Sequence, residues 1–386
     1  MTRFLLSLPV IIMLSTAFMY GQERQSFVMH WRIAATVPPS PGQHIALGFA
    51  GPVAGVHNDA MIVAGGANFP DGMPWDGGKK RYYDDVLVYK MAGEKLTQQK
   101  KTFKLPSAIA YAANCSVENG IVYAGGENEN GISNKVILLQ WNEATENLVI
   151  KYFPGLPQAL TNASAAVYDN IIYVAGGETS TAASDRLYSL DLNNLAAGWQ
   201  ALPPLPVPVS HAVLTIQSNG GYPFLYLVGG RKKNATGISD LYASVYAYDI
   251  EQQLWNTKKS LPYPLAAGTG IAVDSNHILL FGGDKAETFH QVETVLSGIS
   301  AERDEAKKQE LIRQKNQLLI SHPGFSKEVL LYNIVSDEWE VTGTIPFDAP
   351  VTTTAVTWNN EVMIPCGEIK AGVRTPGILA VKIEGK

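Results

Sequence analysis

Cysteine is rare in this chain of 386 residues, which contains Cys115 and Cys366 and no others. Two cysteines alone build neither a disulfide scaffold nor a zinc site. Because they fall in separate apparent strands, and a disulfide needs Cα atoms within about 7 Å, we expect two buried free thiols. Positive charge is also sparse: 30 Lys and Arg residues against 35 Asp and Glu residues give a net charge of −5. We therefore expect no nucleic-acid partner.

Long apolar runs are missing except at the start of the chain, where residues 4–19 follow Arg3. A charged start, a short apolar core and small residues after it are typical of a secretory signal peptide. We therefore predict that residues 1–21 are a signal peptide cleaved within residues 17–21, with an uncleaved anchor as the alternative. The mature protein would then be periplasmic or secreted, without a membrane attachment.

What the chain does have is glycine, 35 residues or about 9% of the total, and much of it is paired. An apolar run ending in two glycines occurs five times, and a sixth, altered copy carries Cys366 in place of the first glycine. The copies read MIVAGG, IVYAGG, IIYVAGG, LYLVGG, ILLFGG and VMIPCGE. They are spaced by 60, 51, 53, 53 and 84 residues, which indicates a repeat architecture.

The same pattern of strands surrounds each copy. An apolar strand and a short turn precede each copy, and a strand of alternating apolar and polar residues follows it. A further strand then begins near an aromatic residue and ends at proline, as after Trp199, Trp255 and Trp339. Four short strands per unit predict an all-β, kelch-type β-propeller, whereas an unrelated β-sandwich would not repeat these residues at fixed offsets. We expect the glycine pairs at the crowded axis with positive φ, and the tryptophans wedged between blades.

The two ends of the chain complete one blade between them. The sixth unit reaches the C-terminus with three strands, and the missing fourth is found at residues 31–35, which have the same aromatic-then-proline pattern. This arrangement predicts one six-bladed propeller over residues 22–386, with its last blade closed by the N-terminal strand. Length alone would have suggested two or three domains.

Two of the loops that follow the glycine pairs are long, residues 67–83 in the first blade and about 284–327 in the fifth. Ring closure places them on either side of the sixth blade, and loops of such length are usually functional. Within the fifth-blade insertion, residues 300–320 contain no Gly or Pro. Acidic residues stand at the start of this segment, and leucines recur in it at helical spacing. They predict an amphipathic helix capped by Ser300, either a lid over the mouth or a helix packed on the surface.

The loop of the sixth blade brings together a carboxylate, Glu368, and a guanidinium, Arg374. Arg374 can bind a substrate carboxylate through two hydrogen bonds, and a desolvated Glu368 can act as a general acid or base. A purely structural ion pair is the alternative. Further basic residues on the same loop face favour an anionic ligand: Lys79, Lys80, Arg81, Arg231, Lys232, Lys233 and Lys285.

The loop sequence GEIKAGVRT resembles the signature of the bacterial N-acetylneuraminate mutarotases, also called N-acetylneuraminate epimerases, which are exported six-bladed kelch propellers. The resemblance covers essentially the whole mature chain, but in rotated order. GFAG, HNDAMIVAGGANF and DDVLVY near the start look like the family's C-terminal portion, while the fifth-blade insertion and VMIPCGEIKAGVRT look like its middle. This is similar to the cyclically permuted branch of that family. The chain departs from the motif by carrying Cys-Gly where Gly-Gly is expected.

The resemblance implies an isomerase that interconverts the α and β anomers of sialic acid, a small acidic sugar. It implies that Glu368 is the acid/base and that Arg374 anchors the substrate carboxylate. Opening and reclosing a hemiketal needs proton transfer, so we expect no metal and no redox cofactor. Accessory substrate-binding candidates on the two flanking insertions are Asn68, Arg81, Tyr82, His290 and His322.

Three other functions compete with this one. The first is a non-catalytic kelch propeller that binds a glycan or protein through its loop face. The second is a sialidase, but the chain has no S-x-D-x-G-x-x-W turn motif. The third is a copper radical oxidase, which needs a Tyr–Cys crosslink, whereas both cysteines of this chain fall within apparent strands.

Overall fold

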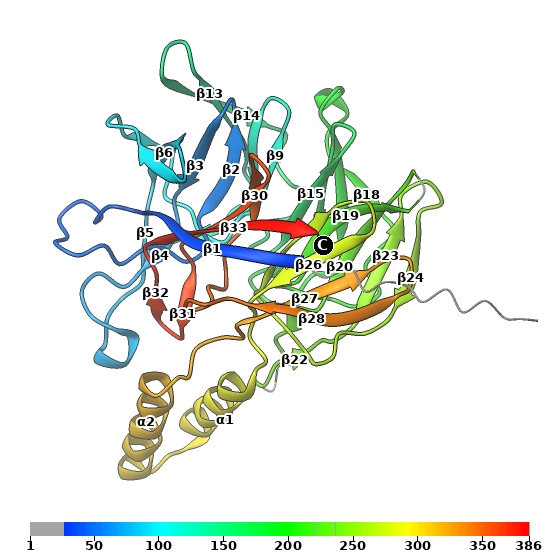
Figure 1. Cartoon of the computed structure of the whole chain (residues 1–386). Coiled ribbons are helices and arrows are strands. Elements are labelled where there is room, and N and C mark those ends of the chain that lie inside the picture. Colours follow the sequence, from blue (N-terminus) through cyan, green and yellow to red (C-terminus); the bar gives the residue numbers. More distant parts are fainter. Residues whose placement is uncertain (1–26, 220, 236, 386) are drawn as a thin grey trace, which may run out of the picture.

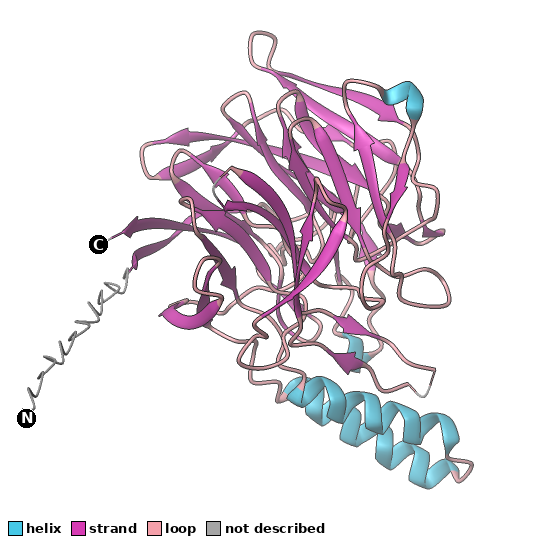
Figure 2. Cartoon of the chain, turned by 90° about the vertical axis from the view of Figure 1, so that its right-hand side faces the viewer, coloured by secondary structure: helices cyan, strands magenta, loops and turns pink. Residues whose placement is uncertain are grey.

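A computed structural model describes residues 27–219, 221–235 and 237–385 (Figure 1). The expected signal peptide, residues 1–21, lies outside the described residues. The described part of the chain forms a six-bladed β-propeller with two α-helices (Figure 2). Neither of these helices is long and apolar enough to cross a membrane.

Each blade is an antiparallel sheet with four main strands. Blade one contains β2 (Val53–His57), β3 (Ala60–Ala64), β6 (Asp85–Ala92) and β7 (Lys95–Gln98), with β8 (Phe103–Lys104) also paired to β6. Blade two contains β9 (Ala113–Val117), β10 (Gly120–Ala124), β13 (Val136–Asn142) and β14 (Asn147–Phe153). Blade three contains β15 (Ser164–Tyr168), β16 (Ile171–Ala175), β17 (Leu187–Asp191) and β18 (Gln200–Leu202), with the 3-10 helix η2 (Leu195–Ala197) before β18.

The remaining blades follow the same order. Blade four contains β19 (Val213–Asn219), β20 (Tyr222–Val228), β23 (Val245–Asp249) and β24 (Leu254–Lys258). Blade five contains β25 (Thr269–Val273), β26 (His277–Phe281), β27 (Glu328–Asn333) and β28 (Glu338–Thr344). Blade six contains β29 (Val356–Trp358), β30 (Glu361–Pro365), β33 (Gly377–Gly385) and β1 (Phe27–Thr36).

The closure of blade six by the N-terminal strand is confirmed. Strand β1 pairs antiparallel with β33, from Phe27 opposite Gly385 to Thr36 opposite Gly377. Figure 1 shows these two strands, blue and red, side by side. Ladder hydrogen bonds between the two ends of the chain therefore hold the ring shut.

The tryptophans join neighbouring blades, as predicted. The indole N–H of Trp199 donates to the carbonyl of Pro154 in the preceding blade at 2.8 Å. Trp339 does the same to Lys259 at 2.9 Å, and Trp255 donates to Pro203 at 3.4 Å. Each ring also packs on apolar residues shared by two blades. Burial of a large ring and a hydrogen bond both stabilise the seam.

The glycine pairs end the second strand of each blade with positive φ, as expected. Gly65 has φ 64°, and a Cβ on it would lie 2.4 Å from the carbonyl oxygen of Ile109 in the next blade. Cys366 takes the same left-handed conformation with φ 56° and is fully buried. Both cysteines are free, as predicted, but Cys115 is only half-buried. Burial raises the pKa of each thiol to about 12.

A closed circle of backbone hydrogen bonds surrounds the axis, one residue from each blade. Each of these residues has positive φ and donates its N–H to the equivalent carbonyl of the preceding blade, at 2.7 to 3.0 Å. The six are Gly51, Tyr111, Asn162, His211, Ala267 and Thr352, called the neck ring below. The ring and the inner strands line an axial cavity of about 430 Å³. The circle holds the blades in register at the end that carries the glycine-pair loops.

The fifth-blade insertion differs from the prediction of one helix capped by Ser300. It forms two helices, α1 (Glu287–Ala301) and α2 (Glu305–Ile320), and Ser300 lies inside α1. The Glu302 carboxylate accepts the N–H groups of Arg303 and Asp304, which breaks the helix, and Asp304 then caps α2 through the N–H of Lys307. Figures 1 and 2 show the helix pair projecting from one end of the propeller.

Candidate functional site

The residue that follows each glycine pair stands at an equivalent place in its blade. Each forms an isolated antiparallel bridge with the residue just before the neck ring. The six residues, called rim positions below, are Ala67, Glu127, Glu178, Arg231, Asp284 and Glu368. Five of the six are charged, so they make the mouth of the propeller a polar site. Sequence reasoning singled out only Glu368 as catalytic, although the shared offset from the glycines marks all six.

Short hairpins extend from most rim positions. They are β4 (Ala67–Asn68) with β5 (Arg81–Tyr82), β11 (Glu127–Asn128) with β12 (Gly131–Ile132), β21 (Arg231–Lys232) with β22 (Asp240–Leu241), and β31 (Glu368–Lys370) with β32 (Val373–Arg374). In blade three a single bridge joins Glu178 to Ala183, and in blade five the helix pair takes this place. The loops of the mouth are therefore ordered by backbone pairing.

Glu368 and Arg374 lie opposite each other in the β31–β32 hairpin. Glu368 Oε1 accepts the N–H of Gly372 at 2.6 Å and lies 3.6 Å from Arg374 Nη1. The Arg374 side chain is 4% exposed, and its Cζ lies 4.7 Å from the centre of the Phe69 ring. Its Nε and Nη1 atoms are buried without a hydrogen-bond partner. Buried donors of this kind are rare, and an anionic ligand would satisfy them.

Asp284 is the rim carboxylate of the neighbouring blade, and sequence reasoning missed it. Its Oδ1 accepts the N–H of Ala286 at 2.8 Å. Burial raises the pKa of Asp284; the Ala286 hydrogen bond, His322 and Arg231 oppose that rise, and Glu368 adds to it. These charges act on one another, so the rim groups of blades four, five and six belong to one electrostatic site.

His322 follows α2 and is buried at 5% exposure. Its Nδ1 accepts the N–H of Gly324 at 3.0 Å, so the neutral ring carries its proton on Nε2. Burial lowers the pKa of His322, while Asp284 and Glu368 act in the opposite direction. The structure therefore places an uncharged imidazole near two carboxylates.

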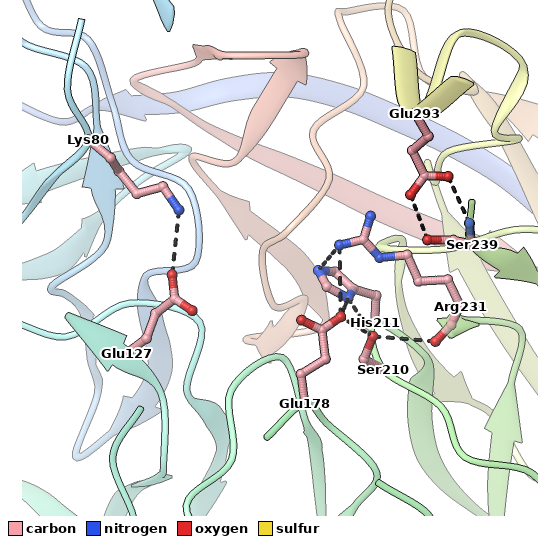
Figure 3. Close-up of polar contacts among 8 residues, drawn as sticks. All are labelled: Lys80, Glu127, Glu178, Ser210, His211, Arg231, Ser239 and Glu293. Carbon is pink, nitrogen blue, oxygen red and sulfur yellow. Dashed lines mark hydrogen bonds and ion pairs between the residues drawn. The ribbon is translucent and has the colours of Figure 1, made fainter. Parts of the chain in front are cut away.

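A chain of polar contacts from Glu178 of blade three ends at Arg231, and its last link is long (Figure 3). The Ser210 hydroxyl donates to Glu178 Oε1 at 2.6 Å, His211 Nδ1 lies 3.0 Å from that hydroxyl, and Arg231 Nη2 lies 3.4 Å from His211 Nε2. Because arginine only donates, Nε2 accepts and the proton of the neutral ring is on Nδ1. Burial, and then Arg231, lower the pKa of His211 well below its usual range.

On the opposite side of the mouth, Tyr82 and Lys80 meet the rim carboxylate Glu127. The Tyr82 hydroxyl donates to Glu127 Oε1 at 2.7 Å, and Lys80 Nζ lies 3.4 Å from the same atom (Figure 3 shows the lysine). Lys80 also lies over the Tyr111 ring at 4.9 Å. Tyr82 thus lies at the rim, but it contacts Glu127 of blade two rather than Glu368.

Three other predicted residues have contacts that do not involve Glu368 or Arg374. Asn68 is buried; its Nδ2 donates to the carbonyl of Gly48 and its Oδ1 accepts the Tyr83 hydroxyl. Arg81 is exposed on β5. His290 lies on the first turn of α1, with Nε2 2.9 Å from the carbonyl of Ser239. Asn68 and His290 therefore have structural contacts that stabilise the surrounding loops.

The two long insertions meet over the sixth blade. The amide of Asn316 on α2 donates to the carbonyl of Trp75, which lies within the 3-10 helix η1 (Pro74–Asp76) of blade one. The hairpin turn of blade six touches the same segment, because a Cβ on Gly372 would lie 2.9 Å from Pro74. The η1 segment of blade one therefore contacts both α2 and the turn of the hairpin that carries Glu368 and Arg374. Within the described part of the chain, no group of three or more His, Cys, Asp or Glu side chains could hold a metal ion.

Comparison with known proteins places this chain in a family. A family model described as N-acetylneuraminate epimerase matches residues 153–386. N-acetylneuraminate epimerase of Salmonella typhimurium (strain LT2) is 27% identical over 225 residues, 58% of this chain and 56% of that protein. The Yersinia enterocolitica protein of the same name is 25% identical over 262 residues, 66% of this chain and 64% of that protein. That of Haemophilus influenzae (strain PittEE) is 25% identical over 223 residues, 58% and 57%.

The chain thus spans less than two thirds of the length of these relatives, between 56% and 64%. The family match begins at residue 153, where β14 of blade two ends, and continues through blade six. It includes four of the rim positions: Glu178, Arg231, Asp284 and Glu368. The rotated order of the first two blades stays a prediction.

Proposed function

Because the chain belongs to the N-acetylneuraminate epimerase family, we propose that it accelerates the interconversion of the α and β anomers of N-acetylneuraminate. The observation that carries the proposal is the buried guanidinium of Arg374, with two donors unsatisfied and the carboxylate of Glu368 beside it. A guanidinium in this state is costly unless a ligand pairs with it. The C1 carboxylate of a 2-keto sugar acid has the charge and planar shape to do so.

The reaction needs one group to accept a proton and one to donate it. Opening the hemiketal removes the proton of the anomeric hydroxyl and adds a proton to the ring oxygen. In our proposal the Glu368 carboxylate accepts the first, and Asp284, the rim carboxyl group of the neighbouring blade, supplies the second from its protonated form, which burial favours by raising its pKa. On reclosure from the other face of the keto group, each proton returns. Both carboxyl groups end as they began, and no net proton is exchanged.

Arg374 and His322 support these steps without changing charge. Arg374 holds the carboxylate while the bond between the keto carbon and its neighbour rotates, which keeps the open chain in place for reclosure. The Nε2–H of neutral His322 is a hydrogen-bond donor near the carboxyl groups of Asp284 and Glu368. In our proposal it stabilises each of them while that group is in its carboxylate form. Proton transfer of this kind contributes about 10² to 10⁴-fold.

NMR exchange spectroscopy of N-acetylneuraminate tests the proposal directly. The wild-type protein should accelerate exchange between the two anomers, and Glu368→Gln should remove nearly all of the acceleration. Glu310→Gln is the matched control, because that carboxylate is 70% exposed on α2. No acceleration by the wild type would contradict the function. Full acceleration by Glu368→Gln would contradict the mechanism, and binding without acceleration would favour the non-catalytic propeller.

A further inference from the structure

A groove of about 680 Å³ lies between helix α1 and the loop that joins β21 to β22. Along one wall, Phe289, Val292 and Leu296 are three and four residues apart and share one face of α1. Arg231 also lines the groove and at the same time occupies the rim position of blade four. The groove is therefore continuous with the mouth that holds Glu368.

The two walls of this groove are held together by hydrogen bonds between residues that line it. The buried carboxylate of Glu293 on α1 accepts the N–H of Ser239 at 2.9 Å and its hydroxyl at 2.7 Å (Figure 3). His290 Nε2 lies 2.9 Å from the carbonyl of the same serine. Three contacts to one residue of the opposite wall hold α1 at a constant distance, so the groove is preformed rather than opened by a ligand.

The chemistry of the groove changes along its length. At the mouth, the Arg231 guanidinium stacks on the Phe289 ring, with Cζ 4.7 Å from its centre, and the Nε atom is buried without a partner. The contacts of Arg231 with His211 and Glu178 are long, 3.4 and 3.9 Å, so its donors are poorly used. Leu296 remains 44% exposed. A ligand that fits presents an acceptor oxygen to Arg231 and an alkyl group to α1.

We propose that this groove binds the N-acyl group of the sugar acid, with Arg231 donating to the acyl carbonyl oxygen and the apolar face of α1 packing on the alkyl chain. The proposal rests on the proposed function, because Arg374 must hold the carboxylate of the same molecule. The groove is many times larger than an acetyl group. Sugar acids with longer N-acyl chains are therefore substrates as well.

A pair of substrates isolates the contribution of Arg231. One is N-acetylneuraminate, and the other is the same sugar acid with a hydroxyl in place of the acylamino group. In Arg231→Gln the ratio of kcat/KM for the acyl substrate to that for the hydroxyl analogue should fall about tenfold or more, mainly through KM. Arg313→Gln, 67% exposed on α2, is the control. An equal loss for both substrates would overturn the role of Arg231.

A second variant tests the volume of the groove without touching Arg231. Wild-type protein should accelerate anomer exchange of N-acetyl, N-propanoyl and N-pentanoyl substrates with similar kcat/KM. Leu296→Trp fills the groove and should lower the ratio for N-pentanoyl over N-acetyl at least tenfold. Leu254→Trp, 59% exposed on the outer strand of blade four, is the matched control. Rejection of the N-pentanoyl substrate by the wild type would overturn the proposal.

Binding measurements separate this proposal from the proposed function. Saturation-transfer NMR reports contact between the acyl methyl protons and the protein whether or not exchange is accelerated. Strong saturation of the N-acetyl methyl in the wild type, reduced in Leu296→Trp, supports the groove even if catalysis fails. Normal acceleration combined with a methyl that receives no saturation overturns the groove and leaves the proposed function intact.

Discussion

The carboxylate of Glu293 in α1 accepts both polar hydrogens of Ser239, the N–H at 2.9 Å and the hydroxyl at 2.7 Å. Glu293 is 7% exposed and Ser239 is 4% exposed. This contact joins an insertion of blade five to a loop of blade four, across the seam between two blades. This buried polar pair is thus one of the contacts that position the projecting helix pair, together with His290 to Ser239 and Asn316 to Trp75.

Glu293→Ala should release α1 from the blade-four loop. The change leaves the two donors of Ser239 buried and unpaired, which costs about 1–3 kcal/mol of local stability. Hydrogen exchange of the α1 amides should become faster, whereas exchange in the inner strands should stay as in the wild type. Glu287→Ala, an exposed carboxylate on the same helix, should leave both unchanged. Equal exchange rates in α1 for both variants would contradict the anchor.

Trp31→Ala should weaken the seam that closes the ring. The Trp31 ring packs edge-on against Phe281 of blade five, with centroids 5.9 Å apart, on the strand that completes blade six. Loss of this contact should lower the free energy of unfolding by about 3 kcal/mol, measured by denaturant titration. Ile33→Ala on the same strand, 53% exposed, should cost far less. Similar losses from the two variants would mean that the contact is not specific.

The blade count and the ring closure were predictable because both depend on local patterns. Each glycine pair is required by positive φ and by a backbone contact with the next blade, so it repeats wherever a blade repeats. The break between α1 and α2 was not predictable from periodicity. Glu302 and Asp304 read equally well as the acidic first turn of one helix and as the turn that separates two.

The candidate site was predicted in part for a similar reason. Glu368 and Arg374 are six residues apart on one hairpin, so their pairing follows from local sequence. The chain from Glu178 through His211 to Arg231 joins residues of two blades, and only the geometry of the ring brings them together. The position after each glycine pair was the available signal, because that position faces the mouth in every blade.

Arg374→Met should greatly weaken substrate binding while keeping the free energy of unfolding at or above the wild-type value. The guanidinium is buried with two unsatisfied donors, so its removal relieves a desolvation cost of about 1–3 kcal/mol, and Glu368 keeps its hydrogen bond from the N–H of Gly372. The KM for N-acetylneuraminate should rise about 100-fold or more. Arg186→Met, 57% exposed, is the control for both measurements. A large drop in unfolding free energy for Arg374→Met would instead indicate a structural ion pair with Glu368.

Asp284→Asn should change how stability depends on pH. Burial raises the pKa of Asp284 above its ordinary value of 3.8, so the folded protein binds this proton more tightly than the unfolded chain does. The stabilising contribution is complete below about 3.8 and is lost as pH rises through the raised pKa. The Asp284→Asn variant should therefore become more stable relative to the wild type as pH rises from about 3.8 through the raised pKa of Asp284.

Thermal unfolding of both proteins, measured from below pH 3.8 up to neutral pH, gives the comparison for Asp284. Asp240→Asn is the control, since that carboxylate is 52% exposed on the same loop face, and the stability of this variant should vary with pH in parallel with the wild type.

Anomer exchange links this titration to the reaction. With Asp284 as the proton donor, acceleration by the wild type falls as pH rises through the raised pKa, and Asp284→Asn is slow at every pH. A fast asparagine variant would move the donor role to another group, with His322 the nearest alternative because its Nε2 carries a proton.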